Sequence, residues 1–530
     1  MQPATFMQAE VAAQEHVPGV GRVFVRTWGC SHNVSDSEYM AGALEAYGYS
    51  VSDKDADLRT ADCAVLNSCT VKGPSQQAFM NMVKKCQDLH VPLVVAGCVP
   101  QGQRDMPELQ HVSIIGTQQI DRVTEAVEQT LAGNTVRLLS KASLPRLDMP
   151  KVRRNPLVEI IPLSTGCLGS CTYCKTRHAR GVLGSYDPDA ILARVESAVK
   201  DGVQEIWLSS EDTGAYGRDI GTTLVQLLRG ILEKLPQDCS TMLRVGMTNP
   251  PFILAQLYEL AAILNDPRVF KFLHVPVQAG SNAVLRAMRR EYTREEFERV
   301  ASFLKRKVPG IYFSTDIICG FPGETEADFE ETLTLIAKHQ FVAVHISQFY
   351  ARPGTPAARM KQISTAVKKD RSRRLTALTR GFVRHEHLRG SVQHVWVGHE
   401  TAPSGEMVGH TACYVKVLLP FDASLVGHRC VARVLDVAKW HVTATPLPQA
   451  EVAALGSAAV HVAANQPLKM KHRSTAPAER KRAAGGELQG GVTQEAAQIE
   501  ADTISPARVA NLALIFVALL LLLQFFGKGQ

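Results

Sequence analysis

Three cysteines stand close together in the string Cys167-Leu-Gly-Ser-Cys171-Thr-Tyr-Cys174. A closed zinc site or an electron-transfer iron–sulfur site normally takes four protein ligands. Three thiolates therefore leave one iron of a cluster open, and an open iron can bind a small molecule. The alternative interpretation is a surface zinc knuckle whose fourth ligand lies elsewhere in the chain.

A second set of three cysteines, Cys30, Cys69 and Cys98, lies in short loops that contain glycine or serine. Each loop directly follows a run of residues that is typical of a buried strand. Because the carboxyl ends of parallel strands meet at one edge of a sheet, we expect the three thiols to converge there as a second three-thiolate cluster. The alternative is a set of independent buried cysteines, which is the interpretation given to Cys63 and Cys86 inside a strand and a helix.

The order of strands and helices predicts an α/β fold class with a parallel sheet in the N-terminal domain. A second alternating region has six strand–helix units and predicts most of a (β/α)6 barrel, whose active-site residues come from the strand carboxyl ends. The expected strands are 23–27, 63–67, 92–96 and 112–116, and then 158–163, 205–208, 243–247, 272–277, 312–318 and 342–349. Short alternating runs over about 391–446 predict a small antiparallel β-barrel at the C-terminal side.

Composition and charge are those of a globular protein with several domains: 530 residues, 45% hydrophobic, 21% charged and a formal net charge of +7. This composition excludes a chain that is disordered throughout. Residues 351–390 contain eleven lysines and arginines against two acidic residues. A solvated helix face explains part of this basic run. A surface that contacts nucleic-acid phosphates explains why its charges are almost all positive. Twelve cysteines without a recognisable signal peptide predict a reducing compartment, the cytosol.

Residues 509–526 read VANLALIFVALLLLLQFF, which is eighteen residues without a charge. This length is near the minimum for crossing a bilayer, so we expect a transmembrane tail anchor, with a buried core helix as the alternative. Basic residues lie mainly before this segment, which places the main body of the chain in the cytosol. Its length favours the endoplasmic reticulum membrane over the outer mitochondrial membrane. The polar stretch before it, 448–506, predicts a flexible linker.

Several strings resemble those of the radical SAM (S-adenosylmethionine) methylthiotransferase family, over about residues 22–446. The matching strings are TWGCSHN at 27–33, NSCTV at 67–71, AGCV at 96–99, STGCLGSCTYCKT at 164–176, EDTGAYGRD at 211–219, HVPVQAGSNAVLRAMRREYT at 274–293 and TDIICGFPGET at 315–325. The first string, the tail and the terminal barrel are most similar to the eukaryotic tail-anchored branch that acts on threonylcarbamoyladenosine in tRNA. The resemblance implies a methylthiotransferase domain at 22–135, a radical SAM barrel at 155–385, a TRAM-like RNA-binding barrel at 388–447, a linker at 448–506 and a transmembrane anchor at 507–526.

The same resemblance implies SAM and two 4Fe-4S clusters as cofactors. The radical SAM cluster would lie on Cys167, Cys171 and Cys174, and an auxiliary cluster on Cys30, Cys69 and Cys98. Since the C2–H bond of adenine has no acidic proton to remove, a radical cofactor has to supply the reactivity. The implied reaction inserts a methylthio group at C2 of the modified adenosine beside the anticodon. The implied partners are the tRNA anticodon arm, an electron donor and a sulfur source, and the enzyme is expected to be a monomer.

Seven further residues are implied to bind SAM. Tyr173 would lie near the SAM adenine, Glu211 or Asp212 would pair with its amino group, Arg244 would orient its carboxylate, and Gln278, Gly320 and Gly323 would shape the pocket. The alternative for each polar side chain is an ordinary hydrogen bond within the barrel.

Two other functions stay open at this point. One keeps the fold but changes the acceptor to isopentenyladenosine in tRNA or to a ribosomal-protein aspartate. The other is a membrane-tethered RNA-binding protein whose cysteines hold zinc. Iron analysis separates the last from the rest, because two clusters predict about eight irons per chain.

Overall fold

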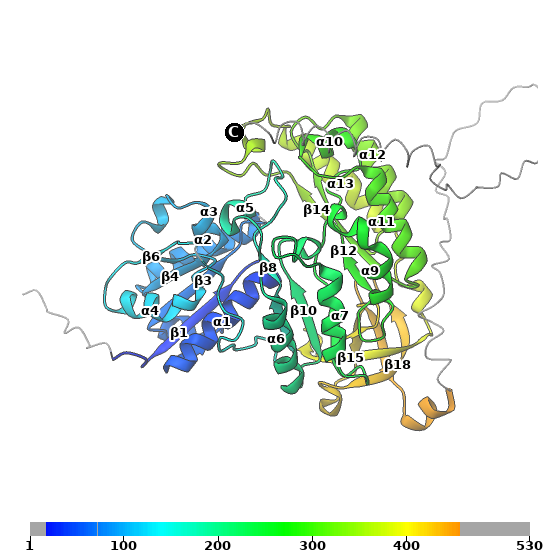
Figure 1. Cartoon of the computed structure of the whole chain (residues 1–530), viewed down its shortest axis with the longest axis horizontal. Helices are drawn as coiled ribbons and strands as arrows, with labels where there is room; N and C mark the ends of the chain where they lie inside the picture. Colours follow the sequence, from blue (N-terminus) through cyan, green and yellow to red (C-terminus); the bar gives the residue numbers. More distant parts are fainter. Residues whose placement is uncertain (1–16, 72, 142, 456–530) are drawn as a thin grey trace, which may run out of the picture. The chain divides into compact units, whose positions relative to one another are not determined.

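The computed structural model of the chain describes residues 17–71, 73–141 and 143–455 (Figure 1). The expected membrane anchor at 507–526 and most of the expected linker lie outside these residues, and the start of that linker, 449–455, is helical. No helix in the described part of the chain is both long enough and apolar enough to cross a membrane.

The N-terminal domain is a parallel sheet, as its alternating pattern predicts (Figure 1). The sheet has six strands in the order β2-β1-β3-β4-β5-β6. Its strands are β1 Arg22–Thr27, β2 Ser50–Ser52, β3 Cys63–Ser68, β4 Leu93–Gly97, β5 Ser113–Ile115 and β6 Arg137–Leu138. Its helices are α1 Ser31–Tyr47, α2 Gly73–Asp88, α3 Cys98–Gly102 and α4 Val123–Leu131. The prediction missed β2 and β6, which are too short to show a period of two.

Helices cover both faces of this sheet because successive strand residues point to opposite sides. Val23 and Val25 join the core that contains residues of α1 and α4, whereas Phe24 between them joins the core that contains Phe79 and Val83 of α2. This two-sided burial explains why the strands read as continuous apolar runs.

The second region has six parallel strands that form a partial barrel, again as predicted. They are β7 Val158–Pro162, β10 Glu205–Ser209, β11 Met242–Arg244, β12 Phe272–His274, β13 Tyr312–Cys319 and β14 Ala343–Gln348. Strands β7, β10 and β11 form one sheet and β12, β13 and β14 another, and a parallel bridge between Leu243 and Val269 lies between the two. The short strands β8 Ser164–Thr165 and β9 Gly184–Ser185 pair separately.

The longer helices of the barrel are α6 Pro188–Lys200, α7 Leu224–Lys234, α9 Leu257–Leu264, α11 Arg294–Lys307, α12 Glu326–His339 and α13 Thr365–Arg380. The shorter ones are α5 Thr176–Arg180, α8 Pro250–Ile253 and α10 Asn282–Ala287. Local sequence explains several starts: Thr293 and Thr325 form capping boxes with Glu296 and Asp328, and Asp187 caps α6 ahead of a proline.

The C-terminal domain is a closed barrel of five strands, β15-β16-β17-β19-β18. Its strands are β15 Val392–Thr401, β16 Met407–Thr411, β17 Lys416–Leu419, β18 Arg429–Val437 and β19 Val442–Pro446. The prediction of a purely antiparallel barrel is wrong in one pair, since β17 and β19 run parallel where the barrel closes. Closure leaves the small sheet without an open edge.

One hydrophobic core contains residues of both the N-terminal sheet and the partial barrel, including Tyr39 of α1 and Ile161 of β7. A buried charge network strengthens this junction, because the Lys151 ammonium binds Glu38 of α1 at 3.2 Å and Glu159 of β7 at 2.8 Å. The domain boundaries expected from the sequence stay predictions.

Candidate active site

The loop with the CxxxCxxC string lies between β8 and α5 at the carboxyl end of the first barrel strand. Cys167 N–H donates to the Gly181 carbonyl at 3.2 Å, and Cys174 N–H donates to the Cys171 carbonyl at 3.1 Å. The Arg177 guanidinium binds the Gly169 carbonyl at 2.7 Å. All three cysteines are free and half-buried, so the loop is folded by its backbone while its thiols stay accessible.

Gly169 lies between two of these thiols. A Cβ atom at this position would be 3.6 Å from the Cys167 sulfur and 3.9 Å from the Cys171 sulfur, so both sulfurs approach the same point of the backbone. Burial, with the Asp212 carboxylate as a second cause, raises the pKa of the Cys167 thiol to about 12. Burial also raises the pKa of Cys174. These thiols ionise when a cation is bound beside them, which is the donor chemistry of an iron–sulfur site.

The N-terminal trio forms as the sheet topology predicts. Strands β1, β3 and β4 are neighbours, and the three cysteines follow their carboxyl ends. Cys30 is the residue before α1, Cys69 follows β3, and Cys98 begins α3. Cys69 and Cys98 are buried, whereas Cys30 is exposed.

Asn33, in the first turn of α1, holds the three loops together. Its side-chain N–H group donates to the carbonyls of Trp28 and Ser68 at 3.1 and 2.8 Å. Its Oδ1 atom lies 3.8 Å from the Cys30 sulfur and 3.9 Å from the Cys98 sulfur. Sequence reasoning missed Asn33 because it expected α1 to begin near residue 35, one turn later than it does.

Gly29 permits the close approach of the first two loops. Its φ is +119°, and a Cβ atom there would lie 2.3 Å from the Cys69 Cβ and 2.8 Å from its sulfur. A hydrogen bond with Cys69 lowers the pKa of Cys30 to about 6, and Cys69 is correspondingly raised in pKa. Three converging thiols with one already acidic fit a cluster that takes three thiolates.

The Arg180 guanidinium connects α5, the helix after the barrel trio, to α1, the helix after Cys30. It ends α5, directly after the barrel trio, and is 1% exposed. Its Nη2 atom binds Asn33 Oδ1 at 2.9 Å and Asp36 Oδ2 at 2.6 Å, and its Nε atom lies 3.1 Å from Glu211. Since Asn33 also contacts Cys30 and Cys98, this buried cation ties α5, the helix that follows the barrel trio in the chain, to the N-terminal trio.

Comparison with known proteins agrees with this arrangement. The radical SAM superfamily matches residues 161–336, and the uncharacterized protein family UPF0004 matches residues 22–115. The chain is 49% identical to the threonylcarbamoyladenosine tRNA methylthiotransferase of Homo sapiens over 82% of its own length and 76% of that protein. The same-named protein of Xenopus laevis is 49% identical over 83% of this chain and 80% of its own length, and that of Drosophila pseudoobscura pseudoobscura is 51% identical over 80% and 77%.

The chain belongs to the radical SAM methylthiotransferase family. It is therefore an enzyme, and its superfamily implies SAM and a 4Fe-4S cluster as cofactors. The barrel trio has the donors and the accessibility for that cluster.

Two of the residues expected to bind SAM lie beside this cluster loop. Tyr173 packs edge-on against Phe321, and its hydroxyl lies 3.5 Å from Nη1 of Arg290. Asp212 is buried, which raises the pKa of its carboxyl to about 6, and it accepts hydrogen bonds from the backbone and side chain of Asn249 at 3.1 and 2.6 Å. Their contacts with SAM stay predictions.

Arg290 is a member of this group that sequence reasoning did not single out. Its Nη1 atom lies 3.2 Å from the Cys171 sulfur, and its Nη2 atom binds the Asn249 side chain. The RAMRREYT portion of a family-like string contains it, but nothing in that string separates it from the neighbouring arginines. Its contact with Cys171 places a positive charge at the edge of the cluster loop.

Glu211 and Asp212 are adjacent in sequence but point to different parts of the site. Glu211 lies 3.2 Å from His32 Nδ1 and 3.1 Å from Arg180 Nε, on the side of the N-terminal trio. Of the two acidic residues named for the SAM amino group, Asp212 is the one that shares a partner, Asn249, with Arg290, which contacts Cys171 of the cluster loop.

Three further residues expected at the pocket lie at an isolated bridge, Gln278, and in a turn, Gly320 and Gly323. Gln278 has a φ of +72° and bridges β13, because its N–H donates to the Asp316 carbonyl at 2.8 Å. Gly320 and Gly323 both have positive φ, and the Gly320 N–H donates to the buried Glu324 carboxylate at 2.7 Å. Glu324 is itself bound by Arg371 at 2.7 Å, so the turn is held from α13.

Arg244 contacts aromatic rings rather than these groups. Its guanidinium carbon is 4.7 Å from the ring centre of Tyr414, in the C-terminal barrel, and 5.0 Å from that of Trp207. No contact of Arg244 with the cluster loop accompanies them in the described residues. Its role toward the SAM carboxylate stays a prediction.

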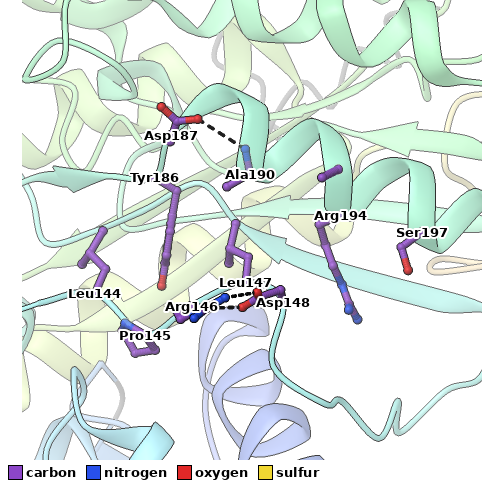
Figure 2. Close-up of a pocket in the computed structure, with 11 residues that line it drawn as sticks. Leu144, Pro145, Arg146, Leu147, Asp148, Tyr186, Asp187, Ala190, Arg194 and Ser197 are labelled. Atoms are coloured by element: carbon purple, nitrogen blue, oxygen red, sulfur yellow. Dashed lines mark hydrogen bonds and ion pairs between the residues drawn. The ribbon is translucent and has the colours of Figure 1, made fainter.

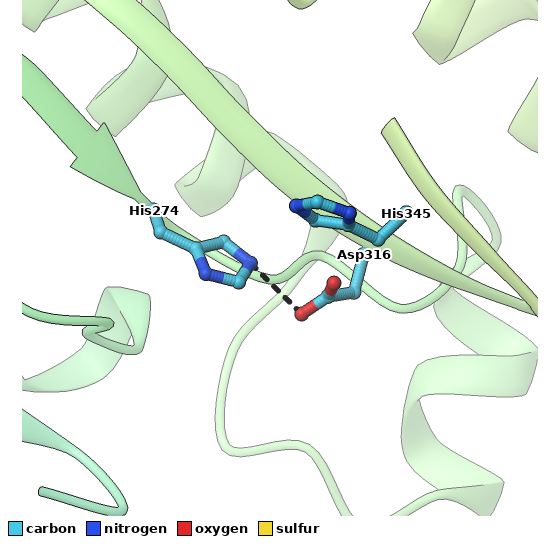
Figure 3. Close-up of side chains that lie close together, drawn as sticks. All are labelled: His274, Asp316 and His345. Atoms are coloured by element: carbon cyan, nitrogen blue, oxygen red, sulfur yellow. Dashed lines mark hydrogen bonds and ion pairs between the residues drawn. The ribbon is translucent and has the colours of Figure 1, made fainter. Parts of the chain in front are cut away.

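A histidine–aspartate group lies on the inner side of the barrel strands (Figure 3). Figure 3 shows His274, Asp316 and His345 directed toward one another. His274 Nε2 and Asp316 Oδ2 are 2.9 Å apart, and His345 Nε2 lies 3.1 Å from the Ser314 hydroxyl. Each member of this group offers a ligand atom within 4.8 Å of the others.

A pocket of about 580 Å³ lies elsewhere, between α6 and the segment 144–148 (Figure 2). Figure 2 shows Tyr186 and Arg194 on one side and the paired Arg146 and Asp148 on the other. None of the residues expected at the active site lines it.

Proposed function

We propose that this enzyme is a tRNA methylthiotransferase that joins a methylthio group to C2 of N6-threonylcarbamoyladenosine beside the anticodon. The observation that carries the proposal is the Arg180–Asn33 contact, which joins the helix after the barrel trio to the helix after Cys30, in a chain about half identical to relatives of that name. A methylthiotransferase needs a radical source and a sulfur donor that act on one carbon atom, and a shared buried cation suits that need.

We further propose that Cys30, Cys69 and Cys98 hold a second 4Fe-4S cluster. Gly29 and Asn33 support this, because they bring together three loops that otherwise belong to separate strands. When bound, the barrel cluster with SAM supplies the radical that removes hydrogen from C2, and the N-terminal cluster supplies the sulfur. The chain's own task is to orient these groups: Arg290 and Asn249 fix the cluster loop against Asp212, and Arg180 fixes it against α1.

Nucleoside analysis by mass spectrometry tests the proposed function. Anaerobically reconstituted enzyme, SAM, a reductant and a sulfide source should convert a threonylcarbamoyladenosine anticodon stem-loop to its 2-methylthio form. The matched substrate with isopentenyladenosine should stay unchanged. Conversion of that substrate, or of a ribosomal-protein peptide, in place of the threonylcarbamoyl RNA would overturn the proposal.

The basic run provides part of the proposed tRNA surface. Three of its arginines serve the fold instead: Arg371 and Arg374 bind acidic residues of the α12 region, and Arg384 donates to the Thr379 carbonyl. The exposed cations along α13 are Lys369, Arg373 and Arg380. We propose that these contact the anticodon arm, so the tRNA affinity should fall steeply with salt. If the tRNA affinity did not change with salt concentration, these three side chains would only form the solvent-exposed face of the helix.

Residues 509–526 support a further proposal, that the enzyme is anchored in the endoplasmic reticulum membrane with its catalytic body in the cytosol. Microscopy of a tagged chain with and without residues 507–530 tests it. Reticular staining that becomes diffuse on deletion is the expected result, and identical distributions would refute the proposal.

A further inference from the structure

The inner face of the barrel strands carries polar residues that the cluster chemistry does not use. Ile206, Leu243 and Leu273 belong to the core shared with the outer helices. Because strand residues alternate between faces, the residues next to them point inward. These inward residues are Trp207, Arg244, Phe272 and His274, and by the same alternation Asp316 and His345, which are next to the core residues Ile317 and Val344.

Arg244 forms the floor of this inner face. Its guanidinium carbon lies 4.7 Å from the Tyr414 ring centre and 5.2 Å from that of Phe272, and its buried Nε atom has no hydrogen-bond partner among the described residues. Aromatic rings on several sides hold the cation in place and keep water away. An arginine held in this way is a receptor for a carboxylate, because its planar fork matches two carboxylate oxygens.

The carboxylate beside this cation is already engaged. Glu205 Oε1 lies 3.0 Å from His410 Nδ1, and Glu205 Oε2 accepts from the Trp207 indole at 2.6 Å. The aromatic cage therefore fixes Arg244 without supplying the anion that its N–H groups can bind.

The wall above this floor is polar and accessible. His274 is the next inward residue after Phe272 on β12, and it pairs with Asp316 (Figure 3). The side chains of His274 and Asp316 are 24% and 30% exposed, and His345 is exposed. Donors and acceptors thus follow one another from the cysteine edge of the barrel toward Arg244.

We infer that this inner face binds the threonylcarbamoyl group of the target adenosine, with Arg244 pairing with its carboxylate. The inference rests on the proposed function. C2 and the carbon that bears N6 flank N1 on the Watson–Crick edge of adenine, and their exocyclic bonds point in different directions. A base that presents C2 to the cysteines therefore directs its N6 substituent away from them. The threonylcarbamoyl group has a carboxylate, a hydroxyl and amide groups that match this face, whereas an isopentenyl group would leave Arg244 without an anion.

Substitution of Arg244 separates this role from binding of the SAM carboxylate. In reconstituted full-length enzyme, Arg244→Met should lower kcat/KM for the threonylcarbamoyl stem-loop about 10- to 100-fold, the loss expected for one charged hydrogen bond. That loss should exceed any loss in RNA-independent SAM cleavage by about tenfold or more. Arg229→Met, which removes an exposed arginine of α7, is the matched control and should match wild type. If Arg244→Met raised the KM for SAM by the same factor by which it lowered kcat/KM for the stem-loop, the inference would be overturned.

A modified substrate tests the same contact without changing the protein. Wild-type enzyme should act about 10- to 100-fold more slowly on a stem-loop whose threonyl carboxylate is converted to a methylamide. Arg244→Met should discriminate between acid and amide by no more than about twofold, as a double-mutant cycle requires. If wild-type enzyme acted at equal rates on the carboxylate and methylamide stem-loops, this inference would be overturned but the proposed function would not. If wild-type enzyme formed no product from the threonylcarbamoyl stem-loop with its free carboxylate, the proposed function would be refuted as well.

Discussion

The two cysteine trios are built in opposite ways. The barrel trio comes from one short string, in which all three cysteines stay half-buried and the loop's own backbone fixes their spacing. The N-terminal trio comes from three neighbouring strands, and Asn33 of α1 joins the loops. Three cysteines can therefore be brought together by local spacing or by sheet order, and the second kind of arrangement depends on more of the fold.

Removal of one ligand from each trio should give the largest effect. Cys171→Ala should abolish SAM cleavage and product, whereas Cys98→Ala should abolish product but retain formation of 5′-deoxyadenosine. Each variant should lose about four of about eight irons. Chromatography with mass spectrometry and iron analysis measure these quantities, and Cys430→Ala in the C-terminal barrel is the control. Loss of SAM cleavage in both variants would contradict separate roles for the trios.

Arg180 binds Asn33 and Asp36 of α1 from the helix that follows the barrel trio, and its removal should give the next largest effect. Arg180→Met removes the guanidinium from the nearly buried Asp36 and Glu211 and leaves them beside the His32 imidazole. We expect a loss of about 3–5 kcal/mol in unfolding free energy. Urea unfolding measures this loss. Arg122→Met, which breaks the exposed pair with Glu125, should cost less than about 1 kcal/mol. If Arg180→Met and Arg122→Met lost similar amounts of unfolding free energy, Arg180 would not be a structural link between α5 and α1.

Glu159 tests the contact between the domains at a distance from the cysteines. Although burial opposes the change, Lys151 and Arg194 lower the pKa of Glu159 to about 2. A lowered pKa stabilises the fold above the ordinary value near 4.5, and this stability is lost as the pH falls toward 2. The shift corresponds to about 3 kcal/mol at neutral pH. Urea midpoints of Glu159→Gln should therefore be lower than wild type at pH 7, and the difference should shrink below pH 4.

The sequence was sufficient to predict the barrel trio, because CxxxCxxC is a local pattern. It also predicted the N-terminal trio, since each cysteine follows a recognisable strand. It did not predict Asn33, Arg180 or Arg290, whose partners lie far away in the chain and become neighbours only when the domains pack. The same cause explains the basic run, where Arg371 binds a glutamate 47 residues away.

Parallel closure of the C-terminal barrel was missed for a related reason. Periodicity identifies β17 and β19 as strands, but it does not tell which strands become neighbours or in which direction they run. Pairing of these strands depends on how the whole barrel closes.

The smallest expected effect comes from a pair of glycine substitutions, one in each trio, which compare the two trios directly. Gly29→Ala would place its Cβ 2.3 Å from the Cβ of Cys69 at a φ of +119°, so the loops around the N-terminal trio have to move apart. We expect a loss of about 1–3 kcal/mol in stability and of about half of the iron. Gly169→Ala makes only ordinary contacts with two barrel sulfurs, at 3.6 and 3.9 Å, and should retain both iron and SAM cleavage. If iron is lost equally from both variants, the barrel loop is as tightly constrained as the N-terminal trio, and the contrast between local and topological sites does not hold.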